Sequence, residues 1–484
     1  MGYQDTQFSY LYQNLKAQIT SGYLRPGSRL LSTRQLCQVH QVGARTVSGV
    51  LAALKAEGYI DLYPRRAAVV RCWRAGPDPA AAALTVLAKR DSLIPLYQTM
   101  AVVLPSLLVF AAQGCALEEL PHFGQPMRTD REEGDGWRTA SSLCRGLLRR
   151  SGNPLFSSLY ITFESNGHLA FFVEEQKTFT GLSFRNISPK ADWMTAVLSG
   201  GDPLQKFQRL TATYRNLAAW VAESIKLLEI AFPGCPAQPE DVFLWNIAQG
   251  RNHCYNRIAR DLMRKIRSRQ YQPGAYLPYE AELAAQYGVS VSTVRSALAL
   301  LGRLGFSKTL NAKGTIALLP EKPAALRALQ AETDPRDLML YLFSLQFMAL
   351  VIRPAALLAA PRLSRADCKA LEARFDLPGA TPLTDVVTCL LDRLELGPLR
   401  AILTEAHNLS QWGYYLTFCS DIEATSINQA SHSLLDLLQA GNIRGFADGL
   451  AGCYCRVLDL ARQFTVERFH LAQARAVATP QLRL

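Results

Sequence analysis

The chain has 484 residues, a length that favours three or four domains at roughly 150 residues each. Hydrophobic residues make up 49% and charged residues 19% of the chain, which excludes a protein dominated by disorder. The formal net charge is +12, and an excess of Lys and Arg favours a polyanionic partner, because phosphate contacts release counterions. This charge identifies a partner only if it lies on elements that fit a groove.

The cysteines argue against a metal ribbon and against secretion. Eleven Cys are scattered along the chain without a C-x-x-C pair, so neither a zinc ribbon nor a redox motif is expected. The odd count, with no apolar leader behind Met1, favours a reducing cytoplasm and free thiols. We therefore expect a cytoplasmic protein in which each Cys is a small buried hydrophobe.

Two apolar runs, residues 92–117 and 338–352, are candidates for membrane segments. The first is uncharged and long enough to cross a bilayer, but Pro95 and Pro105 interrupt it. The second ends before Arg353 and is expected to be too short to span. We expect both runs to form buried core helices and expect no membrane partner.

An internal repeat organises the chain. The segment LRPGSRL at residues 24–30 is echoed by YQPGAYL at residues 271–277. The same offset, held without gaps, also pairs Thr46 with Thr293. It pairs further apolar residues and glycines, namely Leu15 with Leu262, Leu36 with Leu283, Val47 with Val294, Leu51 with Leu298 and Gly58 with Gly305. Chance does not readily produce such agreement, so a duplication is predicted.

A fainter echo follows each copy and pairs Tyr97 with Tyr341, at a nearly constant offset. It predicts that a two-domain unit was duplicated, and the first unit is expected to end near residue 240, after Pro233-Gly234. The expected domains are two small ones at residues 1–75 and 250–320, and two helical ones at residues 90–232 and 330–475.

The first small domain has the pattern of three helices and a wing. Leu11, Leu15 and Ile19 recur at helical spacing, and Ser32 is a plausible N-cap for a short second helix. A third helix carries apolar residues as far as Gly58. Residues 59–62 and 67–71 have strand character, with residues 64–66 as the tip of their hairpin.

The second small domain repeats this order. Its helices are expected at residues 258–268, 279–286 and 292–304, followed by a wing at residues 306–318. Three helices followed by a two-stranded wing form the geometry that places a recognition helix in the major groove of DNA. The predicted fold class is therefore mainly α, with two winged helix-turn-helix domains alternating with two all-α domains.

Both small domains closely resemble the DNA-binding domain of the GntR family of bacterial transcription regulators. The match runs through L-x-P-G-x-x-L, then T-V-x-x-x-L-x-x-L-x-x-x-G, then the wing. That family usually reads DNA with arginines on the second and third helices and with a glycine in the wing. Each copy departs from this pattern at different positions: Ala44, Ser48 and Ala67 in the first, Ala281 and Val291 in the second.

The resemblance implies a set of DNA-contacting residues in each copy. In the first copy they are Arg34, Arg45, Thr46 and Ser48, with Arg65 and Arg66 in the wing. In the second copy they are Ser290, Ser292, Thr293 and Arg295, with Lys313, Gly314 and Thr315 in the wing. The alternative is solvated surface charge. Since a base-reading Arg supplies about 1–3 kcal/mol of discrimination, we expect the two copies to recognise different half-sites.

The helical domains are more weakly similar to the effector domain of the FadR-type branch of that family. Members of that branch often hold a divalent metal with an Asp and three His. Here Ala140 and Cys144 occupy the first two expected ligand places, and Thr384 and Thr388 occupy them in the repeat. We therefore predict no metal site and no cofactor. Within the first helical domain, residues 158–174 are ambiguous between strand and helix.

The sequence thus predicts a non-enzymatic transcription regulator of GntR type that binds double-stranded DNA. A small organic effector could bind between the helices, or the two helical domains could simply pack on each other. Both DNA-binding domains lie in one chain, so an intramolecular pseudo-dimer or a homodimer is expected. The alternative function is a protein-interaction module with degenerate winged helices. No phosphate-binding glycine loop, H-E-x-x-H motif or nucleophile elbow supports an enzyme.

Overall fold

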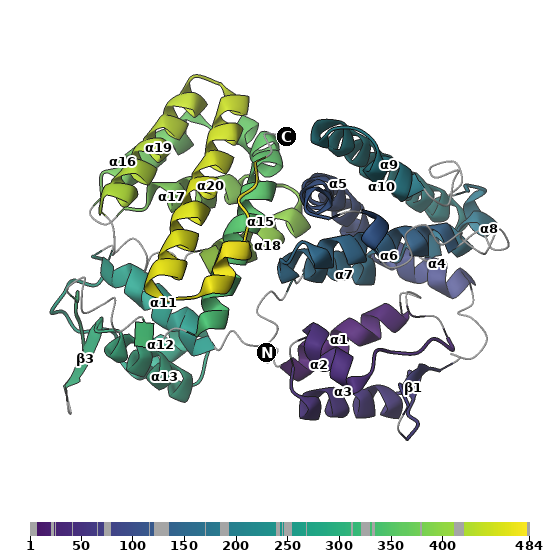
Figure 1. Ribbon diagram of the computed structural model, residues 1–484, viewed down its shortest axis with the longest axis horizontal. Coiled ribbons are helices and arrows are strands. Elements are labelled where there is room, and N and C mark those ends of the chain that lie inside the picture. Colours follow the sequence, from purple (N-terminus) through teal and green to yellow (C-terminus); the bar gives the residue numbers. More distant parts are fainter. Residues whose placement is uncertain are drawn as a thin grey trace. The chain divides into compact units, whose positions relative to one another are not determined.

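The structure is a computed structural model of the chain. It describes residues 7–20, 24, 26–40, 42–64, 66–71, 79–115, 117–120, 135–169, 171–183, 193–238, 243, 245, 254–267, 269–310, 313–320, 330–331, 334–377, 380–410 and 421–481. The chain forms two compact units, one made mostly of residues 4–250 and the other mostly of residues 251–481. Each unit contains a small winged-helix domain and a larger helical domain (Figure 1). The predicted fold class is confirmed.

The first winged helix is built as its sequence pattern predicts. Its elements are α1 (Gln7–Thr20), α2 (Thr33–His40), α3 (Ala44–Ala56), β1 (Ile60–Asp61) and β2 (Val69–Val70). Leu11, Leu36 and Val47, one from each helix, are almost completely buried in a common apolar core. Packing of these three side chains fixes the helices against one another.

The wing strands of the first winged helix are shorter than the predicted segments 59–62 and 67–71. Only Ile60–Asp61 pairs with Val69–Val70, in antiparallel register. The backbone of the second segment is shared with the chain before α2, because Leu30 N donates to Ala68 O at 2.8 Å and Val70 N donates to Ser28 O at 2.9 Å. Because backbone groups of this segment bond to the chain before α2, fewer of its residues pair within the hairpin.

The second winged helix repeats this arrangement (teal in Figure 1). Its elements are α11 (Cys254–Arg267), α12 (Glu280–Tyr287), α13 (Val291–Arg303), β3 (Ser307–Leu310) and β4 (Gly314–Ala317). Leu262, Leu283 and Val294 occupy the core positions of the first copy's Leu15, Leu36 and Val47. The third helix of each copy ends at a glycine with φ of +80°, Gly58 and Gly305, a conformation that side chains with a Cβ rarely adopt.

The first helical domain contains α4 (Pro79–Ala88), α5 (Arg90–Gln113), α6 (Asp135–Arg150), α7 (Pro154–Gly167), α8 (Lys177–Thr180), α9 (Trp193–Ser199) and α10 (Pro203–Ala231). The 3₁₀ turn η1 (Leu117–Glu119) and the π-helical turn η2 (Phe171–Glu175) interrupt the series. Of the ambiguous residues 158–174, residues 158–167 belong to α7 and residues 171–174 to η2, so these parts are helical. Asn153 begins α7 by accepting a hydrogen bond from Leu155 N at 3.0 Å, and Phe163 is completely buried.

The second helical domain contains α15 (Pro335–Ala359), η4 (Ala360–Arg362), α16 (Arg365–Phe375), α17 (Pro382–Asp392), α18 (Gly397–Ser410), α19 (Asp421–Gln439), α20 (Ile443–Arg468) and η6 (Ala472–Ala476). Its two longest helices, α15 and α20, pack along each other, as α5 and α10 do in the first helical domain. Each long pair forms the centre of its domain.

The two apolar runs are helices packed inside the fold. Residues 90–113 and 335–362 are both long and apolar enough to cross a membrane, and 72% of the most apolar window of each is buried. The expectation that the second run is too short to span is wrong, because the helix continues past Arg353. The Arg353 side chain forms an ion pair with Asp448 of α20, with Nε 2.5 Å from Oδ1. Its charge is therefore balanced inside the fold.

A buried carboxylate lies in the core of the first helical domain. Glu164 of α7 accepts hydrogen bonds from Ser141 and Arg145 of α6, and only 6% of its side chain is exposed. Burial raises the pKa of Glu164 above its usual value, although the Arg145 guanidinium opposes that shift. The pair joins α6 to α7 at a position that water cannot easily solvate.

Replacing Arg145 with Ala should destabilise the first unit strongly. Removal of one partner from a buried ion pair costs about 3–5 kcal/mol, because the remaining charge is left unpaired. Without the guanidinium the pKa of Glu164 rises further, so the loss should shrink as the pH falls through that pKa and the carboxyl gains a proton. Urea unfolding at neutral and mildly acidic pH measures both effects. The double variant Arg145→Ala/Glu164→Gln should recover most of the loss, and a loss of equal size at both pH values would contradict this account.

Candidate nucleic-acid interface

The second helix of the first winged helix starts at a well-formed cap. Gln35 N donates to Ser32 Oγ at 3.3 Å, and Ser32 N donates to Gln35 Oε1 at 3.0 Å. This reciprocal pair satisfies backbone groups at the start of α2 and confirms the predicted role of Ser32. Arg34 follows in the first turn of α2, and its side chain is exposed.

The third helix of the first winged helix separates an apolar face from a polar one. Val47, Val50, Leu51 and Leu54 are buried on the inner face. Arg45 and Ser48 are exposed on the other face, and Thr46 is half-buried between the two. The helical period of 3.6 residues therefore presents the predicted contact residues to the outside while their neighbours hold the core.

The cations of the first winged helix are available for a partner. Among the described residues, Arg34, Arg45 and Arg66 have no ion pair and no side-chain hydrogen bond, and all three are exposed. Arg65 lies outside the described residues. Since exposed guanidinium groups keep their full charge and five donors, they can contact phosphates or base edges without first breaking a bond to the protein.

The third helix of the second winged helix begins with three hydroxyl groups held together. Ser290 caps α13 and accepts a hydrogen bond from Thr293 N at 3.3 Å. The Oγ of Ser290 also lies 2.8 Å from that of Ser292 and 2.9 Å from Oγ1 of Thr293. This arrangement brings the predicted contact residues Ser290, Ser292 and Thr293 together at one end of the helix.

Arg295, the predicted cation of α13, is paired with an acid that sequence reasoning missed. Its Nε donates to Oε2 of Glu280 on α12 at 2.7 Å. The side chains are 67% and 39% exposed, so the pair stabilises the domain by at most about 1 kcal/mol and can open. The charge of Arg295 is nevertheless balanced, whereas the first copy has Thr33 and Ser48 at these two positions. The acidic residue directly before Ala281 was the signal that could have revealed the pair.

Of the predicted DNA-contacting residues in the wing of the second winged helix, Lys313 is exposed and Thr315 is buried. Lys313 is exposed in the turn between β3 and β4, and Gly314 has a φ of +110°. Thr315 is 8% exposed, and its Oγ1 lies 3.2 Å from that of Thr309. Thr315 therefore joins the two strands, and it is the one buried residue among the predicted contact residues that the structure describes.

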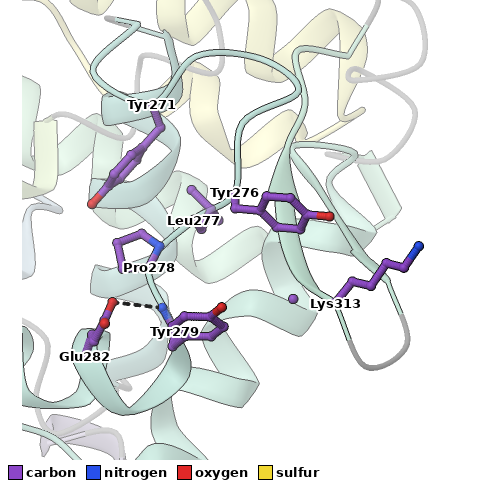
Figure 2. A pocket seen from close by; sticks show the side chains of 8 residues that line it. Tyr271, Tyr276, Leu277, Pro278, Tyr279, Glu282 and Lys313 are labelled. Carbon is purple, nitrogen blue, oxygen red and sulfur yellow. Dashed lines mark hydrogen bonds between the residues drawn. The ribbon is translucent and has the colours of Figure 1, made fainter.

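A pocket of about 510 Å³ lies between this wing and the start of α12 (Figure 2). Its lining residues are Tyr271, Tyr276, Leu277, Pro278, Tyr279, Glu282, Lys313 and Gly314. Tyr276 is 54% exposed and Tyr279 is 70% exposed, which is unusual for large aromatic side chains. These tyrosines were not predicted as DNA-contacting residues, because the family pattern requires no aromatic residue at their positions.

In the helical domains, the residues at the positions where the FadR-type branch carries metal ligands make other contacts. Cys144 is fully buried, and burial raises its pKa to about 12, so its thiol stays protonated at neutral pH. Thr388 Oγ1 donates to the Thr384 carbonyl at 2.8 Å. Among the residues that the structure describes, no three His, Cys, Asp or Glu side chains come together in a way that could hold a metal ion.

Comparison with known proteins finds the same similarity in each of the two small domains. Residues 9–70 and residues 254–316 each match the family model described as "Bacterial regulatory proteins, gntR family". Both small domains are thus similar to the DNA-binding domain of that family. The duplication predicted from the sequence is thus matched by two separate occurrences of the GntR domain, in the same order of elements.

Individual relatives are similar to parts of the chain. The HTH-type transcriptional regulator TreR of Bacillus subtilis is 38% identical over 65 residues, 13% of this chain and 27% of TreR. The HTH-type transcriptional repressor NagR of the same organism is 36% identical over 80 residues, 16% of this chain and 33% of NagR. The chain thus spans about a third or less of the length of these curated relatives. A solved structure, Streptococcus agalactiae GntR, is 19% identical, with a TM-score of 0.21, over 42% of this chain and 99% of its own.

Replacing Ser290 with Ala should lower the free energy of unfolding of the second winged helix by about 1 kcal/mol, because α13 loses its side-chain cap. The matched control is Gly43→Ser, since Gly43 begins α3 in an extended conformation without a side-chain cap bond. That change should stabilise the first winged helix by only a few tenths of a kcal/mol. Denaturant unfolding of the full chain compares the two variants, and a Ser290→Ala variant as stable as the wild type would contradict the capping role.

Proposed function

We propose that the chain is a sequence-specific DNA-binding transcription regulator of GntR type, with both DNA-binding domains in one polypeptide. The observation that carries this proposal is the occurrence of two GntR-type winged helices, each with a third helix that exposes polar side chains. The net charge of +12 supports a polyanionic partner. A cytoplasmic location follows from a chromosomal target in a bacterium.

The two winged helices would recognise unlike half-sites. The first offers three exposed arginines, Arg34, Arg45 and Arg66. The second offers hydroxyl groups at the start of α13 and one arginine, Arg295, whose charge Glu280 balances. Because arginine forks favour guanine and hydroxyl groups are less selective, the operator would be asymmetric.

One chain would supply both halves of a DNA-binding dimer. Similar features recur in the two helical domains, which supports duplication of the whole unit. Gly201 and Gly441 both have positive φ, and each is followed by a residue, Asp202 or Asn442, that caps the long helix after it. Tyr214 and Tyr454 then lie at equivalent positions of α10 and α20 and are both buried. We infer an intramolecular pseudo-dimer, in contrast to a dimer of identical chains.

A small organic effector would act through the helical domains. In the second, His407 is buried, with Nδ1 3.2 Å from the Tyr454 hydroxyl, and its Nε2 has no hydrogen-bond partner among the described residues. Burial lowers the pKa of His407 to about 4, so the ring is neutral at pH 7.

The helix that carries Tyr454 continues to its C-cap, Phe469, which packs against the core of the second winged helix. Movement of α20 would therefore reach that DNA-binding domain.

Selection from a pool of random duplexes tests the proposal at two salt concentrations. The full-length protein should enrich one bipartite site, and the higher salt should weaken binding. Arg34→Ala/Arg45→Ala should remove preference in one half-site, and Arg295→Ala should remove it in the other, each costing about 1–3 kcal/mol of discrimination per base-reading arginine. Lys55→Ala removes an exposed cation from the opposite end of α3 and is the matched control.

The control variant should keep both half-site preferences. Enrichment of a single half-site, unaffected by Arg295→Ala, would show that only the first winged helix reads DNA. If the wild type enriches no sequence at either salt concentration, the regulator proposal fails, and the winged helices would be docking surfaces for a protein.

A further inference from the structure

The pocket of the second winged helix is formed where the wing meets the start of α12. Tyr276 forms an antiparallel bridge with Ile316 of β4, and its ring lies against Gly314, where an added Cβ would be 3.4 Å from Cδ1 of Tyr276. Tyr279 is the N-cap residue of α12. Figure 2 shows Tyr276 and Lys313 extending from the same side of the pocket, with Tyr271 on the opposite side. The open rim is therefore made by two tyrosines and one lysine.

The polar groups of this rim have the donors that an anion requires. Among the described residues, the hydroxyl groups of Tyr276 and Tyr279 and the ammonium of Lys313 have no hydrogen-bond or ion-pair partner. The carboxylate of Glu282, in contrast, accepts a hydrogen bond from the Tyr279 backbone N at 3.2 Å, which directs it towards the start of α12. The rim thus presents three donor groups and two aromatic faces, while the one acid in the lining is occupied by the helix.

The first winged helix carries cations at two of the three equivalent places. Under the offset that relates the two copies, Tyr276 replaces Arg29, Tyr279 replaces Ser32 and Lys313 replaces Arg66. Arg29 and Arg66 are both exposed. The same surface of the fold therefore carries hydrogen-bond donors in both copies, although a tyrosine replaces Arg29 and a lysine replaces Arg66. A shared requirement for an anionic partner explains this better than two unrelated surfaces would.

We propose that this pocket seats the sugar–phosphate backbone of one DNA strand. A winged helix places its third helix in a groove, and the wing meets the adjacent backbone, so a strand passes between them. The Lys313 ammonium neutralises one phosphate, the Tyr276 and Tyr279 hydroxyls donate to phosphate oxygens, and the two rings pack against deoxyribose. This inference rests on the proposed function and adds how the second winged helix compensates for its missing arginines.

Under this proposal, DNA binding by the pocket depends less on salt concentration than DNA binding by the equivalent surface of the first winged helix. Each neutralised phosphate contributes about −0.9 to the slope of log affinity against log salt concentration. Hydroxyl donors release no counterions, so they add affinity without adding slope. The pocket should therefore bind backbone with only the contribution of Lys313 to the slope, whereas Arg29 and Arg66 of the first winged helix would contribute two such terms.

The test measures binding of the full chain to a short, fluorescein-labelled duplex of random sequence, in an Arg34→Ala/Arg45→Ala background that weakens the first winged helix. Tyr276→Phe/Tyr279→Phe removes both hydroxyls but keeps the rings, and should weaken binding about tenfold without changing the salt slope. Lys313→Ala should reduce the magnitude of the slope by about 0.9. Tyr271→Phe and Lys369→Ala, an exposed lysine of α16, are the matched controls.

The controls should bind as the parent protein does, and melting curves should be unchanged, because Tyr276, Tyr279 and Lys313 are exposed. Unchanged DNA affinity in the tyrosine variants, with weaker binding by Arg295→Ala, would overturn the pocket proposal and leave the proposed function intact. An unchanged slope for Lys313→Ala would also overturn it. Failure of the proposed function has a different signature, since then Arg34→Ala/Arg45→Ala and Arg295→Ala would both bind like the wild type.

Discussion

The hydrogen bonds between the wing and the chain entering the second helix determine where the contact residues lie. In the first winged helix, Gly27 N donates to Val70 O and Leu30 N to Ala68 O, both at 2.8 Å. In the second, Gly274 N donates to Ala317 O and Leu277 N to Thr315 O, again at 2.8 Å. Since a two-stranded hairpin is only marginally stable by itself, these hydrogen bonds to a third segment fix the wing relative to the helices. The recognition helix and the pocket rim depend on that attachment.

On this shared framework the two copies place different side chains at their predicted contact positions. The first keeps exposed arginines, and the second combines hydroxyl groups, tyrosines and an arginine that an acid balances. Phosphate contacts by arginine give strong, salt-dependent affinity, whereas neutral donors give affinity that salt affects less. In the proposed function, the exposed arginines of the first winged helix would therefore make the more salt-dependent contacts, and the hydroxyl groups of the second would make contacts that salt affects less.

The sequence predicted those features that hydrophobic periodicity and backbone conformation encode. Buried positions such as Val47 and Val294 recur at helical spacing, and Gly58 and Gly305 mark helix ends, so the winged helices were found with nearly correct bounds. The Arg295–Glu280 pair and the tyrosine pocket join residues from different elements, and no local pattern reports such contacts. The same reason explains why the second apolar run was predicted to stop before Arg353, since the partner of Arg353 is Asp448 of a helix distant in the sequence.

The helical domains differ in how they connect to the winged helices, and this difference has a functional consequence under the proposed mechanism. In the second unit, Phe469 at the end of α20 packs against the core of the winged helix. In the first unit, the corresponding helix α10 ends at Phe232, whose ring packs against Phe179 of its own domain, 5.1 Å between centroids. A shift of α20 therefore changes packing that includes the second winged helix, whereas a shift of α10 changes packing within the helical domain. An effector that moves both long helices would act more directly on the second winged helix, the copy with fewer cations among its predicted contact residues.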